Sequence, residues 1–239
     1  MSRALVTGGS GTIGAAIARA LAAAGHHVYV HAHGRQERAQ EIASKIRADG
    51  ATAEAVRFDI TDAAETQYAL ETMLAAGAIQ ILVNNAGLHD DAALPGMRPK
   101  QWSHVIDVSL NGFFNVTQPL LLPMIRTRWG RIICISSVAA VMGNRGQANY
   151  AAAKAGMHGA ARSLALELAS RGITVNTVAP GIIASPATET IFPKEVITKL
   201  VPMQRAGQPE EVADLIAFLA SERASYISGQ LISINGAMA

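Results

Sequence analysis

The sequence predicts an α/β fold in which a doubly wound parallel sheet of about seven strands is covered by helices on both faces. Three observations lead to this prediction. Short apolar runs of strand length alternate with helical segments along the 239 residues. A glycine-rich turn joins the first of these runs to the first helix. Hydrophobic residues make up 50% of the chain and charged residues only 16%, which provides for a large core.

The composition argues against several classes of function. The formal net charge of +2 is too small to indicate a nucleic-acid partner. No apolar run approaches the roughly 18 residues of a membrane-spanning helix, and no signal peptide precedes the first strand. Cys134 is the only cysteine, which excludes an intrachain disulfide and favours a reducing compartment. We therefore expect one cytoplasmic domain over residues 1–239, with no membrane or nucleic-acid partner and no metal site.

The first strand, turn and helix form a candidate nucleotide-binding unit. We expect a buried strand over residues 3–7 and an alanine-rich helix over residues 15–24. Between them, Gly9, Gly11 and Gly14 have the spacing G-x-G-x-x-G. Glycines let the backbone approach a pyrophosphate, and free amides at the helix start face the anion. A glycine-rich turn alone is weak evidence, but its position between a strand and a helix predicts dinucleotide binding.

The end of the second strand, expected over residues 27–32, bears on the choice of dinucleotide. A carboxylate there would hold the adenosine ribose hydroxyls and favour NAD, but none is present. Arg35 and Arg38 follow instead, and a cationic pocket without a carboxylate suits a 2′-phosphate. The sequence therefore favours NADP, with Arg35 as the contact. The alternative is that both arginines are the solvated start of the helix expected over residues 36–48.

Polar residues follow the next two strands. A strand over residues 54–58 ends at Asp59-Ile60, and a buried strand over residues 79–83 ends in Asn84-Asn85-Ala86-Gly87. The asparagine pair has two interpretations. It is either a plain strand-end turn, or its amides hold neighbouring strands together at a cofactor crevice.

A long helical region is expected over residues 97–124. Pro119 and Pro123 predict bends or restarts within it. Asn111 stands next to a glycine, and such a pair often marks a kink whose freed carbonyl can bind water. The alternative is a polar residue packed at a helix crossing.

The strongest catalytic candidate is a Tyr/Lys pair. Tyr150 and Lys154 lie one helical turn apart on the same face, and a nearby ammonium favours the phenolate form of a tyrosine. The tyrosine then becomes a usable acid–base group near neutral pH. Ser137 closes a strand expected over residues 131–135, and the loop over residues 138–149 leaves room for the two hydroxyls to converge. The spacing Y-x-x-x-K also occurs by chance in many helices.

The remaining segments complete the alternating pattern. A strand over residues 173–179 leads into Pro180-Gly181. Residues 182–208 are rich in proline and are expected to form an irregular lid at the carboxyl ends of the strands. Pro209 opens a helix at its first position, and a last strand is expected over residues 230–234.

Taken in order, these segments resemble the short-chain dehydrogenase/reductase family nearly from end to end. The resemblance rests on residues 7–14, Asn84-Asn85-Ala86-Gly87, Asn111, Ser137, Tyr150-x-x-x-Lys154 and Pro180-Gly181. Within the family, residues 143–150, 170–176 and 207–211 are most similar to bacterial 3-oxoacyl-acyl-carrier-protein reductases. The resemblance implies a Rossmann-type fold, a nicotinamide cofactor and reduction of a 3-oxoacyl thioester on acyl carrier protein or CoA, with NADPH.

The resemblance also implies roles for individual residues. Tyr150 would protonate the developing alkoxide, and Ser137 would donate a hydrogen bond to the substrate oxygen. Lys154 would hold the nicotinamide ribose and lower the pKa of Tyr150, and Asn111 would anchor a water that supplies protons through Lys154. The implied cofactor contacts are Gly8, Ser10, Gly11, Thr12, Ile13, Gly14, Arg35, Asp59, Ile60, Asn85, Ala86, Gly87, Tyr150, Lys154, Pro180, Gly181, Ile183 and Ser185.

Assembly and partners follow from the same resemblance. Arg128 and Arg171 match basic positions that receive the acidic carrier protein in the reductases, although both also fit ordinary surface charge. The family is usually a tetramer that packs through long helices, here around residues 100–128 and 150–170, and the low charged fraction agrees with a covered surface.

Four departures from the family pattern fall where cofactor geometry and substrate choice are decided. Thr12 replaces the middle glycine of the turn, and Ser185 stands where a threonine is frequent. Residues 186–190 diverge from the usual lid, and residues 88–91 lack a basic residue often found after the Asn-Ala-Gly turn. Two alternatives therefore stand beside the leading hypothesis. One is an alcohol or sugar dehydrogenase for another small carbonyl, and the other is a nucleotide-binding module without chemistry.

Overall fold

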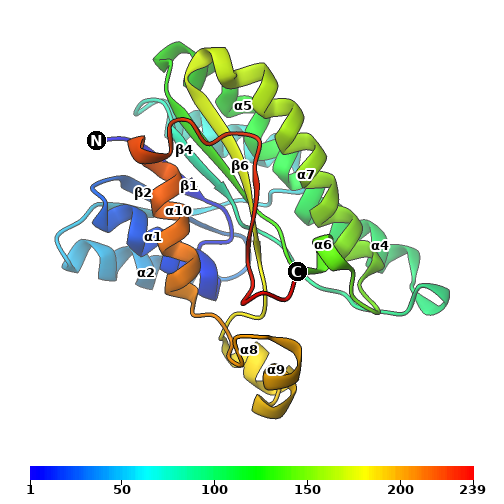
Figure 1. The fold of residues 1–239 in the computed structure, drawn as a ribbon. Coiled ribbons are helices and arrows are strands. Elements are labelled where there is room, and N and C mark those ends of the chain that lie inside the picture. Colours follow the sequence, from blue (N-terminus) through cyan, green and yellow to red (C-terminus); the bar gives the residue numbers. More distant parts are fainter.

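The computed structural model describes all 239 residues and contains one sheet of seven parallel strands in the order β3-β2-β1-β4-β5-β6-β7 (Figure 1). The strands are β1 (Arg3–Val6), β2 (His27–Ala32), β3 (Ala53–Arg57), β4 (Ile81–Asn84), β5 (Gly130–Ile135), β6 (Ile173–Pro180) and β7 (Leu231–Ile234). The helices are α1 (Thr12–Ala23), α2 (Gln36–Ala48), α3 (Ala63–Leu74), α4 (Pro99–Ile106), α5 (Gly112–Thr127), α6 (Ala139–Met142), α7 (Ala148–Leu168), α8 (Pro186–Ile191), α9 (Lys194–Leu200) and α10 (Pro209–Ala220). The predicted fold class is confirmed.

Helices cover both faces of the sheet. Helices α1, α2 and α10 pack on one face, and α3, α5 and α7 pack on the other (Figure 1). Strands β5 and β6 are buried along their whole length, as expected of parallel strands between two helical layers. None of the helices has both the length and the apolar content that crossing a membrane requires.

The strand order reverses between β1 and β4, and side chains tie these two strands together there. Thr7 Oγ1 accepts hydrogen bonds from the backbone N–H groups of Asn85 and Ala86, each at 3.0 Å. The Asn85 amide donates in return to the carbonyl oxygens of Thr7, at 2.9 Å, and Gly8, at 3.1 Å. The asparagine therefore holds neighbouring strands at the switch point, where open α/β sheets bind their ligands.

The helical region expected over residues 97–124 is divided, but not at its prolines. Helix α5 runs without a break through Pro119 and Pro123, contrary to the expected restarts. The division lies earlier, in the π-helical segment Asp107–Asn111 between α4 and α5. Buried residues on α5 anchor it in the core, and this packing outweighs the local preference of proline to end a helix.

The expected irregular lid is more ordered than predicted. Residues 182–208 contain the short helices α8 and α9, which project beyond the carboxyl edge of the sheet (Figure 1). Pro186 occupies the first turn of α8, where the Ser185 hydroxyl accepts a hydrogen bond from the Thr188 N–H at 3.0 Å. Pro193 directly precedes α9. These prolines start helices because the first turn of a helix has N–H groups without intrahelical partners.

The Thr7 hydroxyl provides a test of the junction between β1 and β4. Replacing Thr7 with Val keeps the shape but removes the acceptor of the Ala86 N–H, while the Asn85 N–H keeps the Val83 carbonyl oxygen as a second acceptor. The free energy of unfolding should fall by about 1–3 kcal/mol. Urea unfolding measures this change. Thr72→Val is the control, because the Thr72 side chain is exposed and bonds only to the Tyr68 carbonyl within its own helix. Equal stability of the two variants would show that the junction contributes little.

Candidate active site

A cavity of about 490 Å³ opens at the carboxyl edge of the sheet, between the ends of the central strands, α7 and α8. It brings together most of the residues singled out in the sequence. Those that line it are Gly8, Gly11, Thr12, Ile13, Gly14, Arg35, Asn85, Ala86, Gly87, Ser137, Tyr150, Lys154, Pro180, Gly181, Ile183 and Ser185.

The glycine-rich turn at one end of the cavity suits a pyrophosphate. Gly8 has a φ of +62°, in the region that favours glycine, and a Cβ at Gly14 would overlap the Gly8 carbonyl oxygen. Gly11 caps α1 without a side-chain hydrogen bond, so the first amides of the helix are free for an anion. Thr12 lines the cavity as the first residue of the helix.

His31 holds this turn in place, a role that sequence reasoning missed. Its Nδ1 accepts a hydrogen bond from the Gly8 N–H at 3.1 Å, and its Nε2 therefore donates to the Phe58 carbonyl oxygen at 2.9 Å. Burial lowers the pKa of His31 to about 4, so the ring stays neutral and can accept at neutral pH. A single histidine in an apolar strand gives no sequence signal for this bridge.

Tyr150, Lys154 and Ser137 meet at the other end of the cavity. Lys154 is fully buried, and its Nζ donates a hydrogen bond to the carbonyl oxygen of Ile135, the last residue of β5, at 2.8 Å. Nζ lies 5.9 Å from the centre of the Tyr150 ring. The fold thus places the predicted acid–base pair and the predicted hydrogen-bond donor in one site.

The protonation states differ from the sequence-based expectation. Burial raises the pKa of Tyr150 to about 12, while a hydrogen bond with Ser137 opposes this shift and Asp91 adds to it. Burial is the largest influence on the tyrosine pKa, and the Lys154 ammonium donates its hydrogen bond to the Ile135 carbonyl oxygen. Burial lowers the pKa of Lys154 to about 8. At neutral pH the site therefore combines a protonated phenol with a lysine that is largely charged.

The Asn111 side chain is not part of this group. It is exposed and donates a hydrogen bond to Asp107 Oδ1 at 2.7 Å, so only its backbone remains for the predicted water-anchoring role. Ser109, from the same π-helical segment, is buried instead, and its hydroxyl has no partner. A Cβ at Gly87 would lie 3.0 Å from Lys154 Nζ and 3.6 Å from Ser109 Oγ, so Gly87 leaves space between these two groups.

Three predicted cofactor contacts lie outside the lining of the cavity. Ser10 is buried, and Ile60 packs where a Cβ of Gly112 would lie. Asp59 Oδ1 accepts hydrogen bonds from the N–H and hydroxyl of Thr61.

The two predicted docking arginines stand at the opposite edge of the sheet. Arg128 precedes β5 and Arg171 precedes β6, so both lie at the amino ends of strands whose carboxyl ends form the cavity. The sequence already implied this separation, because parallel strands begin at one edge and end at the other.

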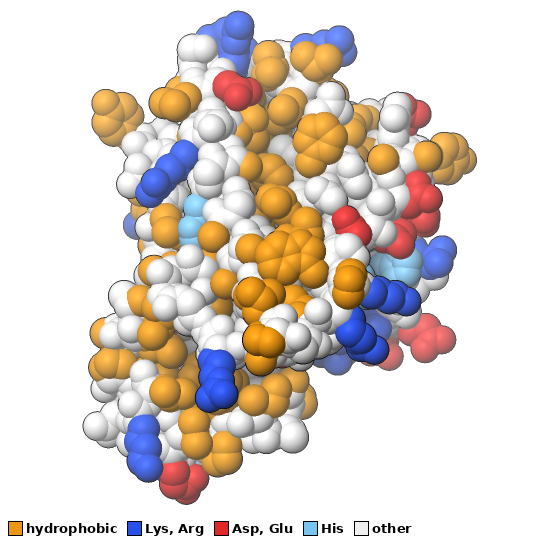
Figure 2. Space-filling model, turned by 90° about the vertical axis from the view of Figure 1, so that its right-hand side faces the viewer, with side chains coloured by type: hydrophobic (Ala, Val, Ile, Leu, Met, Phe, Trp, Pro, Cys, Tyr) orange, Lys and Arg blue, Asp and Glu red, His pale blue; other side chains and the backbone are white.

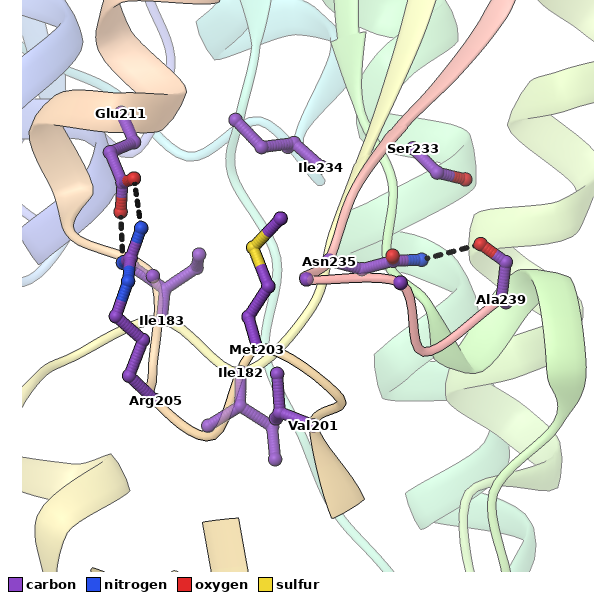
Figure 3. Close-up of a pocket in the computed structure, with 13 residues that line it drawn as sticks. Ile182, Ile183, Val201, Met203, Arg205, Glu211, Ser233, Ile234, Asn235 and Ala239 are labelled. Carbon is purple, nitrogen blue, oxygen red and sulfur yellow. Dashed lines mark hydrogen bonds and ion pairs between the residues drawn. The ribbon is translucent and has the colours of Figure 1, made fainter. Parts of the chain in front are cut away.

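A second hollow of about 500 Å³ lies between α10, β7 and the segment after α9, and shares Ile182 and Ile183 with the first (Figure 3). Its charged side chains are paired with each other. Arg205 forms a two-pronged ion pair with Glu211, and the Asn235 amide donates to the Ala239 carbonyl oxygen at 3.2 Å. This hollow therefore offers no free acid or base, and the reactive groups belong to the first cavity.

Comparison with known proteins gives consistent relatives over the full chain. The model of the short chain dehydrogenase family matches residues 2–196. A 3-oxoacyl-[acyl-carrier-protein] reductase of Aggregatibacter actinomycetemcomitans is 45% identical over 236 residues, which cover 98% of each chain. Proteins of the same name from Staphylococcus aureus and Synechocystis sp. are 44% and 46% identical, over 98% of this chain and 97% and 96% of theirs.

Replacing Lys154 with Met should change how stability depends on pH. The folded-state pKa of Lys154 is about 8, whereas an unfolded lysine titrates at about 10.4. Below pH 8 the folded chain carries a buried charge that the unfolded chain solvates, and this penalty disappears as the pH rises toward 10.4. Relative to Lys154→Met, the wild-type free energy of unfolding should therefore rise by about 2–3 kcal/mol between pH 7 and pH 10. Urea unfolding of both proteins at each pH measures it, and a constant difference would contradict burial of a charged lysine.

Proposed function

The chain belongs to the short-chain dehydrogenase family, and on that basis we propose that it reduces a 3-oxoacyl thioester, carried by acyl carrier protein or CoA, to the 3-hydroxyacyl thioester with NADPH. The observation that carries the reaction type is the protonated Tyr150 beside Ser137, in a cavity that begins at a pyrophosphate-binding turn. The substrate class follows from relatives named as 3-oxoacyl-[acyl-carrier-protein] reductases at 44–46% identity over nearly the whole chain.

Each residue of the site has a separate role in the proposed carbonyl reduction. When bound, the nicotinamide supplies the hydride. Ser137 donates a hydrogen bond to the substrate carbonyl oxygen, and Tyr150 transfers its proton to that oxygen as negative charge develops there. The Lys154 ammonium stabilises the phenolate that remains. Burial of Tyr150 and Lys154 keeps water away from both groups and strengthens their interactions with the oxygen.

The Tyr150 hydroxyl gives the most direct test of the chemistry. Tyr150→Phe should lower kcat for acetoacetyl-CoA reduction by roughly 10²-fold or more, because the proton donor is lost, while the dissociation constant for NADPH stays close to that of the wild type. Absorbance of NADPH follows the rate, and a panel of ketones and polyols in the same assay tests other substrate classes. Unchanged turnover would mean that another group is the acid, and absence of thioester reduction by the wild type would refute the proposed substrate.

We further infer a preference for NADPH from the end of β2. Arg35 lines the cavity, its Nη2 lies 3.9 Å from where a Cβ of Gly11 would be, and β2 ends without a carboxylate. An exposed guanidinium at this place matches a 2′-phosphate, which it can bind through two parallel hydrogen bonds.

Arg35→Ala should therefore weaken NADPH binding by roughly tenfold or more and change NADH binding far less, because only NADPH carries the phosphate. Fluorescence titration gives both dissociation constants. Arg38→Ala is a matched control, since Arg38 lies in the same helical segment but does not line the cavity. Equal losses for both cofactors would contradict the phosphate contact.

Assembly into a homotetramer in the cytoplasm remains our proposal for the working form. Apolar side chains gather on the face formed by α5 and α7 (Figure 2), where Phe114, Leu122 and Leu166 are 63%, 65% and 84% exposed. Such a patch marks an interaction surface, and a second copy of the chain fits the low charged fraction. Docking of a carrier by Arg128 and Arg171 then serves the site of another copy. A light-scattering mass equal to that of one chain would refute the tetramer.

A further inference from the structure

His89 occupies the rim of the active-site cavity, in the short segment that departs from the family pattern. It lines the cavity and packs directly on the proposed proton donor. The centres of the His89 and Tyr150 rings are 4.0 Å apart, and the ring planes are tilted by 35°. An imidazole with two polar nitrogens thus stands beside the phenol, and no step of the proposed carbonyl reduction uses it.

The hydrogen bonds around Gln147 define the state of this imidazole. Asp91 Oδ2 can only accept, so the Gln147 group 2.8 Å from it is the donating amide nitrogen. The Gln147 oxygen in turn accepts from the Asn144 amide at 2.9 Å. The same Gln147 nitrogen lies 3.2 Å from His89 Nδ1. Because this amide nitrogen only donates, His89 Nδ1 accepts the second amide hydrogen of Gln147. The hydrogen of the neutral ring is then on Nε2, and Nε2 has no hydrogen-bonding partner in the protein.

The surroundings of His89 lower its pKa and favour the neutral ring. The side chain is 57% exposed, but its partial removal from water is the main influence and lowers its pKa, the Asp91 carboxylate opposes this, and the Lys154 ammonium adds to it. Asp91 Oδ1 lies 3.9 Å from His89 Nδ1, too far for a hydrogen bond. His89 therefore presents a free N–H donor at neutral pH.

We propose that His89 Nε2–H donates a hydrogen bond to the thioester carbonyl of the substrate while Tyr150 and Ser137 hold the 3-keto group. A 3-oxoacyl thioester has its two carbonyl groups on either side of one methylene carbon, and the site has donors on two adjacent rings to match. His89 is thus a substrate-positioning residue that selects 3-oxoacyl thioesters over ketones with a single carbonyl. This inference rests on the proposed function.

Two variants and two substrates test the role. His89→Phe keeps an aromatic ring against Tyr150 but removes the donor, and His89→Gln keeps an N–H donor without the ring. The substrates are the acetoacetyl thioester of N-acetylcysteamine and its thioether analogue, in which CH₂ replaces the thioester carbonyl. His89→Phe should lower kcat/KM for the thioester by roughly ten- to a hundredfold, mainly through KM, because a partner for the second carbonyl is lost.

The thioether analogue supplies the internal control. His89→Phe should leave its kcat/KM within about twofold, and His89→Gln should retain most of the thioester activity. If the analogue is reduced too slowly to follow, its inhibition constant against the thioester replaces the rate. Equal losses on both substrates, or an unchanged rate on the thioester, would overturn the inference. Failure of the wild type to reduce the thioester at all would instead count against the proposed function.

A measurement on the unmodified protein guards against a variant that does not fold. Nitrogen-15 NMR of His89 should report the Nε2–H tautomer, and addition of the 3-hydroxyacyl thioester product with NADP⁺ should shift the Nε2 resonance more than that of Nδ1. The opposite tautomer, or an Nε2 resonance that does not respond to the product, would contradict the proposed contact.

Discussion

The hydrogen bond from Lys154 Nζ to the carbonyl oxygen of Ile135 is the interaction on which the rest of the site depends. It ties α7 to the carboxyl end of β5, where the backbone of a strand end is free to accept. The hydroxyl of Ser136 strengthens the same junction by donating to the Lys154 carbonyl oxygen at 3.3 Å. Because Tyr150 lies one helical turn before Lys154, this junction also sets where the phenol stands relative to Ser137 and the cavity.

Burial, more than the pairing of charges, decides how this site can react. An ammonium removed from water loses hydration energy, and a phenolate does as well, so the lysine pKa falls and the tyrosine pKa rises. The result is a phenol that holds its proton until a developing oxyanion needs it. If the pKa of Tyr150 lay below the working pH, the phenol would already be ionised before substrate binds and could not act as the acid in a reduction. Burying these two groups at the junction with β5 lowers the stability of the folded chain, and it sets the protonation states that the reaction uses.

Much of the fold was predictable because each strand and turn has a local signal, whereas the details of the site depend on burial and on distant partners. The alternation of strands and helices gave the sheet, and Tyr150 and Lys154 were placed by their spacing. In the π-helical segment, the side chain of Ser109 is buried near Lys154, whereas the side chain of Asn111 is exposed. The Asn111-Gly112 pair indicated a kink here, but it did not indicate which neighbouring side chain is buried. The contact between His89 and Tyr150 was not predictable from the sequence either, because it is formed by the packing of two segments far apart in the chain.

Titration of Tyr150 in the unmodified protein tests most directly whether burial controls the site. Carbon-13 labelling at Cζ allows each of the four tyrosines to be followed by NMR, and the Tyr150→Phe variant assigns the resonance. We expect Tyr150 to remain protonated through pH 10, in line with a pKa of about 12 raised by burial. A tyrosine that loses its proton near pH 7 would show instead that Lys154 controls the phenol, and would contradict the dominant role of burial.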